Sequence, residues 1–135
     1  MNISDRTIDT LAASLNMRQL RQKLITSNIA NAETPGYKAK RLDFEEALAR
    51  AIDIDKMQSL NTDNDKHYNV GGGGFKNLKP EVYEDANGVV KDDGNTVDRD
   101  YEMAMMADNQ ILYNATVQLL KKKLGLMNYA ISAEK

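Results

Sequence analysis

The sequence has no cysteine and only one histidine, His67. The absence of cysteine excludes disulfide bonds and thiol chemistry, and it suits a reducing or an oxidising compartment equally well. Because zinc sites in proteins are built mainly from cysteine and histidine, we expect no metal site. The chain also has no stretch of about 18 apolar residues and no basic start followed by an apolar core. We therefore expect neither a membrane span nor a cleaved secretory signal peptide.

Neither sign of charge is in large excess, since 18 basic and 20 acidic residues leave a net charge of -2. This balance disfavours binding to nucleic acid or to an anionic membrane surface. No nucleophile, base and orienting group stand together in the sequence, so we expect no catalytic residue, no cofactor and no small-molecule substrate. With 135 residues the chain has enough material for one domain with a modest core. An enzyme and a nucleic-acid binder are thus both disfavoured.

The distribution of proline and glycine divides the chain into three parts. Residues 4–31 contain neither, and residues 96–133 contain only Gly125, so both segments are predicted to be long helices. Residues 32–95 contain both prolines and the other seven glycines. Within them we predict a short amphipathic helix from Phe44 and a small β-hairpin that joins residues 82–84 to 89–91. The fold class is mainly α, with the two long helices packed as an antiparallel coiled coil.

Apolar residues of the C-terminal helix form two separate rows. The longer row follows alternating gaps of three and four residues, the spacing of a coiled-coil seam, and we assign it to packing against the N-terminal helix. Its members are Met103, Met106, Gln110, Tyr113, Val117, Leu120, Leu124, Met127 and Ile131. The second row recurs every seven residues on another side, and we assign it to contacts with neighbouring subunits. Its members are Met105, Leu112, Leu119 and Leu126.

The N-terminal helix also has two apolar sides. One consists of Ile8, Leu11, Leu15 and Ile29. The other includes Met17, Leu20 and Leu24, which we also assign to contacts between subunits. Two helices of one chain can cover only one stripe of each other, and exposed apolar stripes of this length mark interfaces. The alternative is that the middle segment folds back over the remaining stripes, which its polar, glycine-rich composition disfavours.

A sharp turn follows the N-terminal helix. Pro35 has no backbone N–H and disfavours helix at the residue before it, so the helix has to end there. The sequence Thr34-Pro35-Gly36-Tyr37 fits a type II turn in which Gly36 takes a positive φ. Asn28 and Asn31 lie on one helix face, and we expect their amides to bond with backbone groups left unpaired at the helix end.

Three further patterns are weak. Gly71–Gly74 lacks the Gly-Lys-Ser/Thr of a phosphate-binding loop, and residues 63–67 lack the glycine and glutamate of a calcium-binding loop. We interpret both as ordinary loops. We interpret the triple lysine 121–123 as a solvated helix face or a contact to an acidic neighbour, rather than as a nucleic-acid patch.

Two segments resemble a known family. Residues 28–40 read NIANAETPGYKAK, and residues 92–120 read DDGNTVDRDYEMAMMADNQILYNATVQLL. Both are similar to signature segments of the flagellar axial proteins of the rod and hook type. The second segment and the chain length favour the proximal rod member of that family, with the sister short rod protein as the alternative. The resemblance does not extend to the middle, about residues 54–92.

The resemblance implies a structural role. The terminal helices would stack with those of neighbouring subunits into a helical tube, the drive shaft that carries torque from motor to hook and filament. Implied partners are other copies of this chain, other rod proteins, and the adaptor and membrane-ring proteins at the motor base. The chain would pass the flagellar type III export apparatus without a cleaved signal and reside in the basal body, where the rod spans the periplasm. A secreted helical adaptor is the other open class, but it gives no reason for the turn motif.

Overall fold

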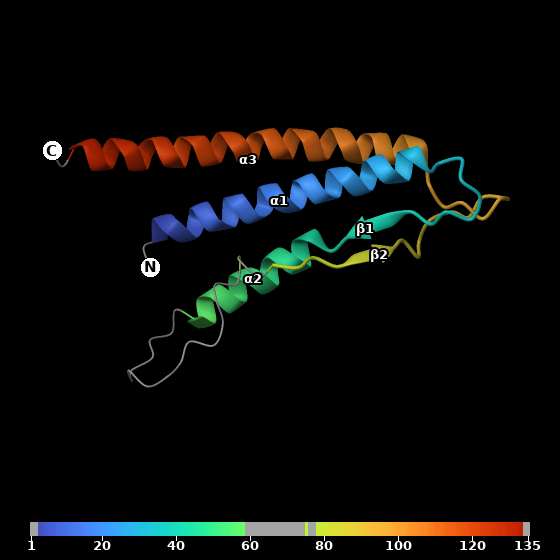
Figure 1. Ribbon diagram of the computed structural model, residues 1–135, viewed down its shortest axis with the longest axis horizontal. Coiled ribbons are helices and arrows are strands. Elements are labelled where there is room, and N and C mark those ends of the chain that lie inside the picture. Colours follow the sequence, from blue (N-terminus) through green and yellow to red (C-terminus); the bar gives the residue numbers. More distant parts are fainter. Residues whose placement is uncertain (1–2, 59–74, 76–77, 134–135) are drawn as a thin grey trace.

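Three layers make up the molecule in the computed structural model, which describes residues 3–58, 75 and 78–133 (Figure 1). The central layer is helix α1, Ile3–Ala30, and helix α3, Arg99–Ala133, packs along one side of it. Helix α2, Phe44–Gln58, and strands β1, Lys40–Leu42, and β2, Val82–Glu84, lie along the other side. The long helices run antiparallel, so the mainly α class and the pairing of the terminal helices are confirmed.

The ends of both long helices follow from local chemistry. Helix α1 stops before the Pro-Gly turn, and α3 begins at Arg99, three residues after the predicted boundary. The Asp98 carboxylate caps α3, because its Oδ1 accepts hydrogen bonds from the backbone N–H groups of Asp100 and Tyr101 at 3.1 and 3.2 Å. These N–H groups have no partner inside the helix, and a carboxylate also complements the positive helix N-terminus.

The two-stranded sheet has a different topology from the predicted hairpin. Strand β2 forms at residues 82–84, but its antiparallel partner is β1, with Arg41 opposite Tyr83. Residues 89–91 are not a strand, and the Lys91 N–H instead donates to the Asn95 carbonyl at 2.9 Å. An isolated hairpin is marginal in water, whereas β1 is already held against α1. The hairpin prediction is therefore wrong about the partner strand.

The main apolar core lies between α1 and the middle segment. Met17 is 3% exposed and packs in a cluster with Leu42, Phe44 and Ala47. Leu20 and Leu24 pack against this cluster together with Leu48 and Leu78. Assigning Met17, Leu20 and Leu24 to contacts between subunits is therefore wrong, and the alternative in which the middle segment folds back holds for this stripe. The average composition of that segment was misleading, because its apolar residues gather on one face of α2.

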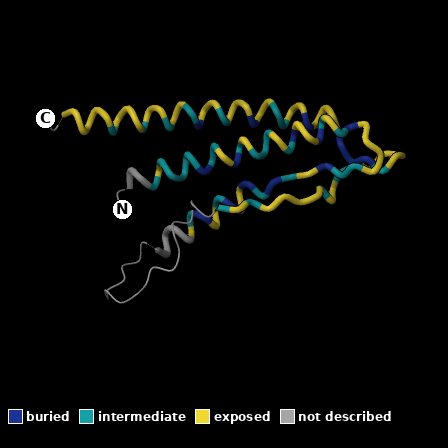
Figure 2. Tube along the Cα trace, in the orientation of Figure 1, coloured by how far each residue is buried: buried dark blue, intermediate teal, exposed yellow. Residues whose placement is uncertain are grey.

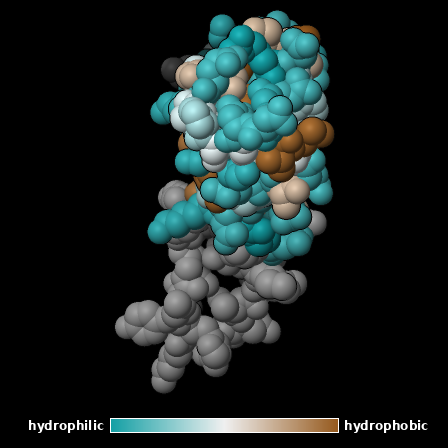
Figure 3. Space-filling model, turned by 90° about the vertical axis from the view of Figure 1, so that its right-hand side faces the viewer, coloured by the Kyte–Doolittle hydropathy of each residue, from teal (hydrophilic) through white to brown (hydrophobic). Residues whose placement is uncertain are grey.

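We use the term closed end for the end of the molecule at which α1 turns into β1. It consists of residues 31–39 and 85–98, and both ends of the described chain lie at the opposite end (Figure 1). Figure 3 looks onto the closed end, where hydrophilic residues dominate the surface. The polar groups beneath this surface hold the two long helices in place.

Candidate assembly interface

The two signature segments meet at the closed end. The Gly36 N–H donates to the Asp93 carbonyl at 2.9 Å, and the Thr96 N–H donates to the Tyr37 carbonyl at 3.0 Å. Asn95 is fully buried, and its Nδ2 donates at 2.8 Å to the carbonyls of both residue 31 and residue 34. Two segments about sixty residues apart in the sequence thus form one hydrogen-bonded unit.

The turn has the geometry that the sequence predicts. Gly36 has φ 73°, and the Tyr37 N–H donates to the Thr34 carbonyl at 3.2 Å. With Pro35 fixing a negative φ before it, this is a type II turn. Asn31 acts as predicted, because its Nδ2 donates to the Ser27 carbonyl in the last turn of α1 at 2.8 Å.

Asn28 has a different role from the predicted helix-end cap. It is fully buried, and its amide pairs with both backbone groups of Lys40, accepting from the N–H at 3.0 Å and donating to the carbonyl at 2.9 Å. The same Nδ2 lies 3.2 Å from Glu102 Oε2. Asn28 therefore joins α1 to β1 and to α3, a contact that only the folded chain could reveal.

A buried ion pair completes this contact. Glu102 on α3 is 0% exposed, and its Oε1 accepts a 2.6 Å hydrogen bond from Arg41 Nη1 on β1. The Arg41 guanidinium also pairs with Asp85 through Nε at 3.2 Å and lies 5.3 Å from the centre of the Tyr101 ring. Breaking such a pair leaves a buried charge without compensation, so the pair strongly favours one arrangement of the three segments.

The contact between α3 and α1 has a polar centre. The buried residues of α3 are Glu102, Asn109 and Thr116, which recur every seven residues. Asn109 Nδ2 donates to the Arg18 carbonyl and to Gln22 Oε1, both at 3.0 Å. Sequence reasoning missed this line because it followed apolar residues, although three polar residues at heptad spacing are a detectable signal.

The predicted apolar seam is therefore displaced to the edge of the contact. Met106, Tyr113, Val117, Leu120 and Met127 are half-buried beside the polar line. Leu124 and Ile131 are 43% and 62% exposed, and Met103 and Gln110 are exposed as well, so assigning these four to the seam is wrong. The physical reason is that α1 turns its Met17–Leu24 stripe toward α2 and presents polar groups such as Gln22 to α3.

The second row of α3 is largely uncovered. Leu112, Leu119 and Leu126 are 47%, 57% and 58% exposed, and only Met105 is half-buried. Figure 2 shows exposed residues along nearly the whole length of α3, in contrast to α1. No other part of the described chain covers these three leucines, so their assignment to neighbouring subunits stays a prediction.

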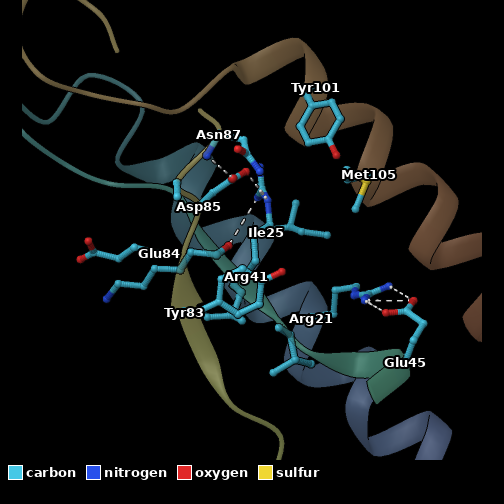
Figure 4. Close-up of a pocket in the computed structure, with 14 residues that line it drawn as sticks. Arg21, Ile25, Arg41, Glu45, Tyr83, Glu84, Asp85, Asn87, Tyr101 and Met105 are labelled. Carbon is cyan, nitrogen blue, oxygen red and sulfur yellow. Dashed lines mark hydrogen bonds and ion pairs between the residues drawn. The ribbon is translucent and has the colours of Figure 1, made fainter. Parts of the chain in front are cut away.

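A groove of about 380 Å³ lies beside this row, between α1, the sheet and the start of α3 (Figure 4). Tyr83, Tyr101 and Met105 line it together with the Arg21–Glu45 ion pair, whose nearest atoms are 3.1 Å apart. Partial burial raises the pKa of the Glu45 carboxyl, but the hydrogen bond and charge of Arg21 outweigh it and leave that pKa below its ordinary value. The groove thus combines aromatic, sulfur and charged groups at the surface.

Some expectations concern parts of the chain outside the described residues. Gly71–Gly74 and residues 63–67 both fall there. Across the described helices, none combines the length and the hydropathy that crossing a membrane would require.

Comparison with known proteins identifies the class of protein that carries these features. Residues 8–38, which include most of α1 and the whole turn, match the family described as Flagella basal body rod protein. A protein from Borrelia hermsii is 38% identical over 138 residues, covering 97% of this chain and 99% of its own length. One from Bacillus subtilis strain 168 is 31% identical over the full length of both chains, and one from Escherichia coli K12 is 32% identical, covering 85% and 86%.

The chain is therefore a flagellar basal-body rod protein, a structural and non-enzymatic component of the motility apparatus. All three relatives carry the name Flagellar basal body rod protein FlgB, and the chain belongs to the FlgB family.

Proposed function

We propose that this chain builds the proximal rod by packing the exposed face of α3 against neighbouring subunits. The observation that carries the proposal is the row Leu112, Leu119 and Leu126, which stays exposed while a different side of α3 is occupied by α1. Burying one leucine side chain contributes about 1.5–3 kcal/mol, so the row can supply much of the energy of a subunit contact.

The closed end gives the subunit the stiffness that torque transmission requires. Directional hydrogen bonds and the Arg41–Glu102 pair fix α3 against α1 and β1. Helix α3 is about 50 Å long at 1.5 Å per residue. A helix pair that is fixed at one end resists sliding along its axis. Torque applied to one subunit is then passed on through the α3 contacts to the next.

The partners follow from the role in the rod. We propose contacts with other copies of this chain and with other rod proteins, and at the base with the adaptor and membrane-ring proteins of the motor. Passage through the flagellar type III export apparatus is part of the same proposal. The names of the relatives favour the proximal rod protein over the sister short rod protein.

A pair of adjacent substitutions tests the assignment of faces. Leu119 is exposed on the row, whereas Leu120 is half-buried beside α1. In cells whose only copy of the protein carries Leu119→Glu, we expect normal synthesis and export but no rod, because a charge would be placed in the subunit contact. Leu120→Glu should destabilise the α1–α3 pair and lower the amount of protein through proteolysis.

Gln110→Glu is the matched control, because it places the same charge on an exposed position on the side of α3 that faces away from the row. It should assemble as the unaltered protein does. The readouts are the amount of exported, unassembled subunit in the medium and the presence of rods in isolated basal bodies. Normal rods with Leu119→Glu would refute the proposed interface.

A further inference from the structure

We infer that neighbouring copies run parallel in the rod and are offset along α3 by two heptads, so that Lys122 of one copy lies beside Asp108 of the next. The inference rests on the proposed packing of the α3 face and adds the register and direction of that packing. It follows from the distribution of charge and side-chain size along the exposed face.

Charge is strongly polarised along α3. All of its acidic residues lie at or before position 108, and its only basic residues after Arg99 are Lys121–Lys123. Between residues 109 and 133 there is no acidic residue at all. Acids near a helix N-terminus complement the helix dipole, but the lysines end ten residues before Ala133, outside the last turn in which the dipole acts. The polarisation therefore calls for another explanation.

Asp108 and Lys122 belong to one column on the exposed side of the helix. The column recurs every seven residues beside the leucine row and reads Tyr101, Asp108, Ala115, Lys122 and Tyr129. All five residues are exposed. Within the described part of the chain, neither Asp108 nor Lys122 has an ion-pair partner. Charges that flank an apolar seam commonly set the register and the choice of partner in coiled coils.

Different offsets between parallel copies give different contacts along this column. With no offset, Asp108 meets Asp108 and Lys122 meets Lys122, which is repulsive. With an offset of one heptad, Asp108 and Lys122 each lie beside Ala115 or a tyrosine of the neighbouring copy, and no ion pair forms. With an offset of two heptads, Lys122 meets Asp108, and Ala115 meets Tyr101 on one side and Tyr129 on the other.

An offset of two heptads also preserves the apolar contacts. It corresponds to about 21 Å along the helix, and it places Leu119 and Leu126 of one copy beside Met105 and Leu112 of the next. An antiparallel pair could also join Asp108 to Lys122, but it would use the same patch on both copies and close as a dimer. A parallel, offset contact uses different halves of α3 on the two copies, so it is not self-complementary and does not close as a dimer.

Charge reversal tests the pair in cells whose only copy of the protein carries the variant. Asp108→Lys and Lys122→Asp should each lose rod assembly, because each places like charges side by side. The double variant should regain rods and swimming. Lys121→Asp is the matched control, since Lys121 projects from another side of the helix, and it should assemble normally. Circular dichroism of the purified variants checks that the helices are retained.

Cysteine cross-linking then determines direction and offset. The chain has no native cysteine, so introduced cysteines are the only thiols. Ala115 and Tyr129 are exposed, and Tyr129 is 76% exposed. After mild oxidation of isolated basal bodies, the double variant Ala115→Cys/Tyr129→Cys should give a ladder of cross-linked subunits. Ala115→Cys alone should remain uncross-linked.

Each alternative result overturns the inference in a recognisable way. Normal rods with either single charge reversal, or no rescue by the double reversal, exclude the ion pair. A dimer cross-linked through Ala115→Cys alone indicates an antiparallel or unshifted pair. If Leu119→Glu blocks assembly while Asp108→Lys does not, the α3 interface holds and only the proposed register fails. If Leu119→Glu assembles normally, the proposed function itself is wrong.

Discussion

The Glu102 carboxylate should contribute more to stability than a carboxylate at the surface does, because it is buried in an ion pair with Arg41. In Glu102→Gln the side chain keeps its shape but loses the charge that compensates Arg41. Removing one partner of a buried pair usually costs about 3–5 kcal/mol. Arg41 keeps Asp85 at 3.2 Å and its side chain is 16% exposed, so we expect a loss at or just below the lower limit of this range, about 2–3 kcal/mol.

Thermal unfolding followed by circular dichroism measures this loss. For a chain of this size, about 2–3 kcal/mol corresponds to a decrease in Tm of roughly 10 °C. Glu102→Leu should lose more, because it also removes the acceptor for Asn28 Nδ2. The control is Glu46→Gln, whose side chain is 81% exposed and whose contact with Arg50 is 3.9 Å long, so its cost should stay below about 1 kcal/mol. If Glu102→Gln is no more destabilised than this control, the buried pair does not hold the closed end together.

Two glycines give further predictions. At Gly36 an added Cβ would meet no atom within 4 Å, so only the positive φ opposes substitution. Asparagine tolerates a positive φ better than a β-branched residue does, so Gly36→Val should lower Tm and swimming more than Gly36→Asn. Equal effects of the two substitutions would contradict the type II turn. Gly125 lies in α3 with open space around it, so Gly125→Ala should stabilise the isolated chain by about 0.5–1 kcal/mol in denaturant unfolding. A more stable Gly125→Ala variant that no longer swims would indicate that a neighbouring subunit packs there.

The sequence predicted those features that depend on neighbours along the chain. The absence of proline and the near-absence of glycine predicted both long helices, and the apolar spacing from Phe44 predicted α2. The Pro-Gly pair predicted the turn, because Pro35 and Gly36 restrict the backbone through their own chemistry. Such constraints act within a few residues, so they can be read without knowing what the segment later contacts.

Contacts between distant segments were predicted poorly. Leu112, Leu119 and Leu126 of the second row are exposed, and the assignment of that row to neighbouring subunits stays a prediction, whereas the side of α3 that meets α1 was misplaced. Hydrophobicity predicted an apolar seam, whereas the chain uses Glu102, Asn109 and Thr116 at that position. The partner of β2 was also missed, since β1 and the 89–91 segment are both plausible neighbours by composition alone.

The sequence by itself thus determined the class of the fold, the turn and the family to which the chain belongs, because propensities, turn chemistry and signature segments are local properties. Only the tertiary structure decided that Asn28, Arg41 and Glu102 form one cluster and that Asn95 holds the turn. The physical reason is that a buried polar group is stable only when its partners are satisfied. Those partners come from segments up to about seventy residues away, and no pattern along the chain specifies which of them will meet.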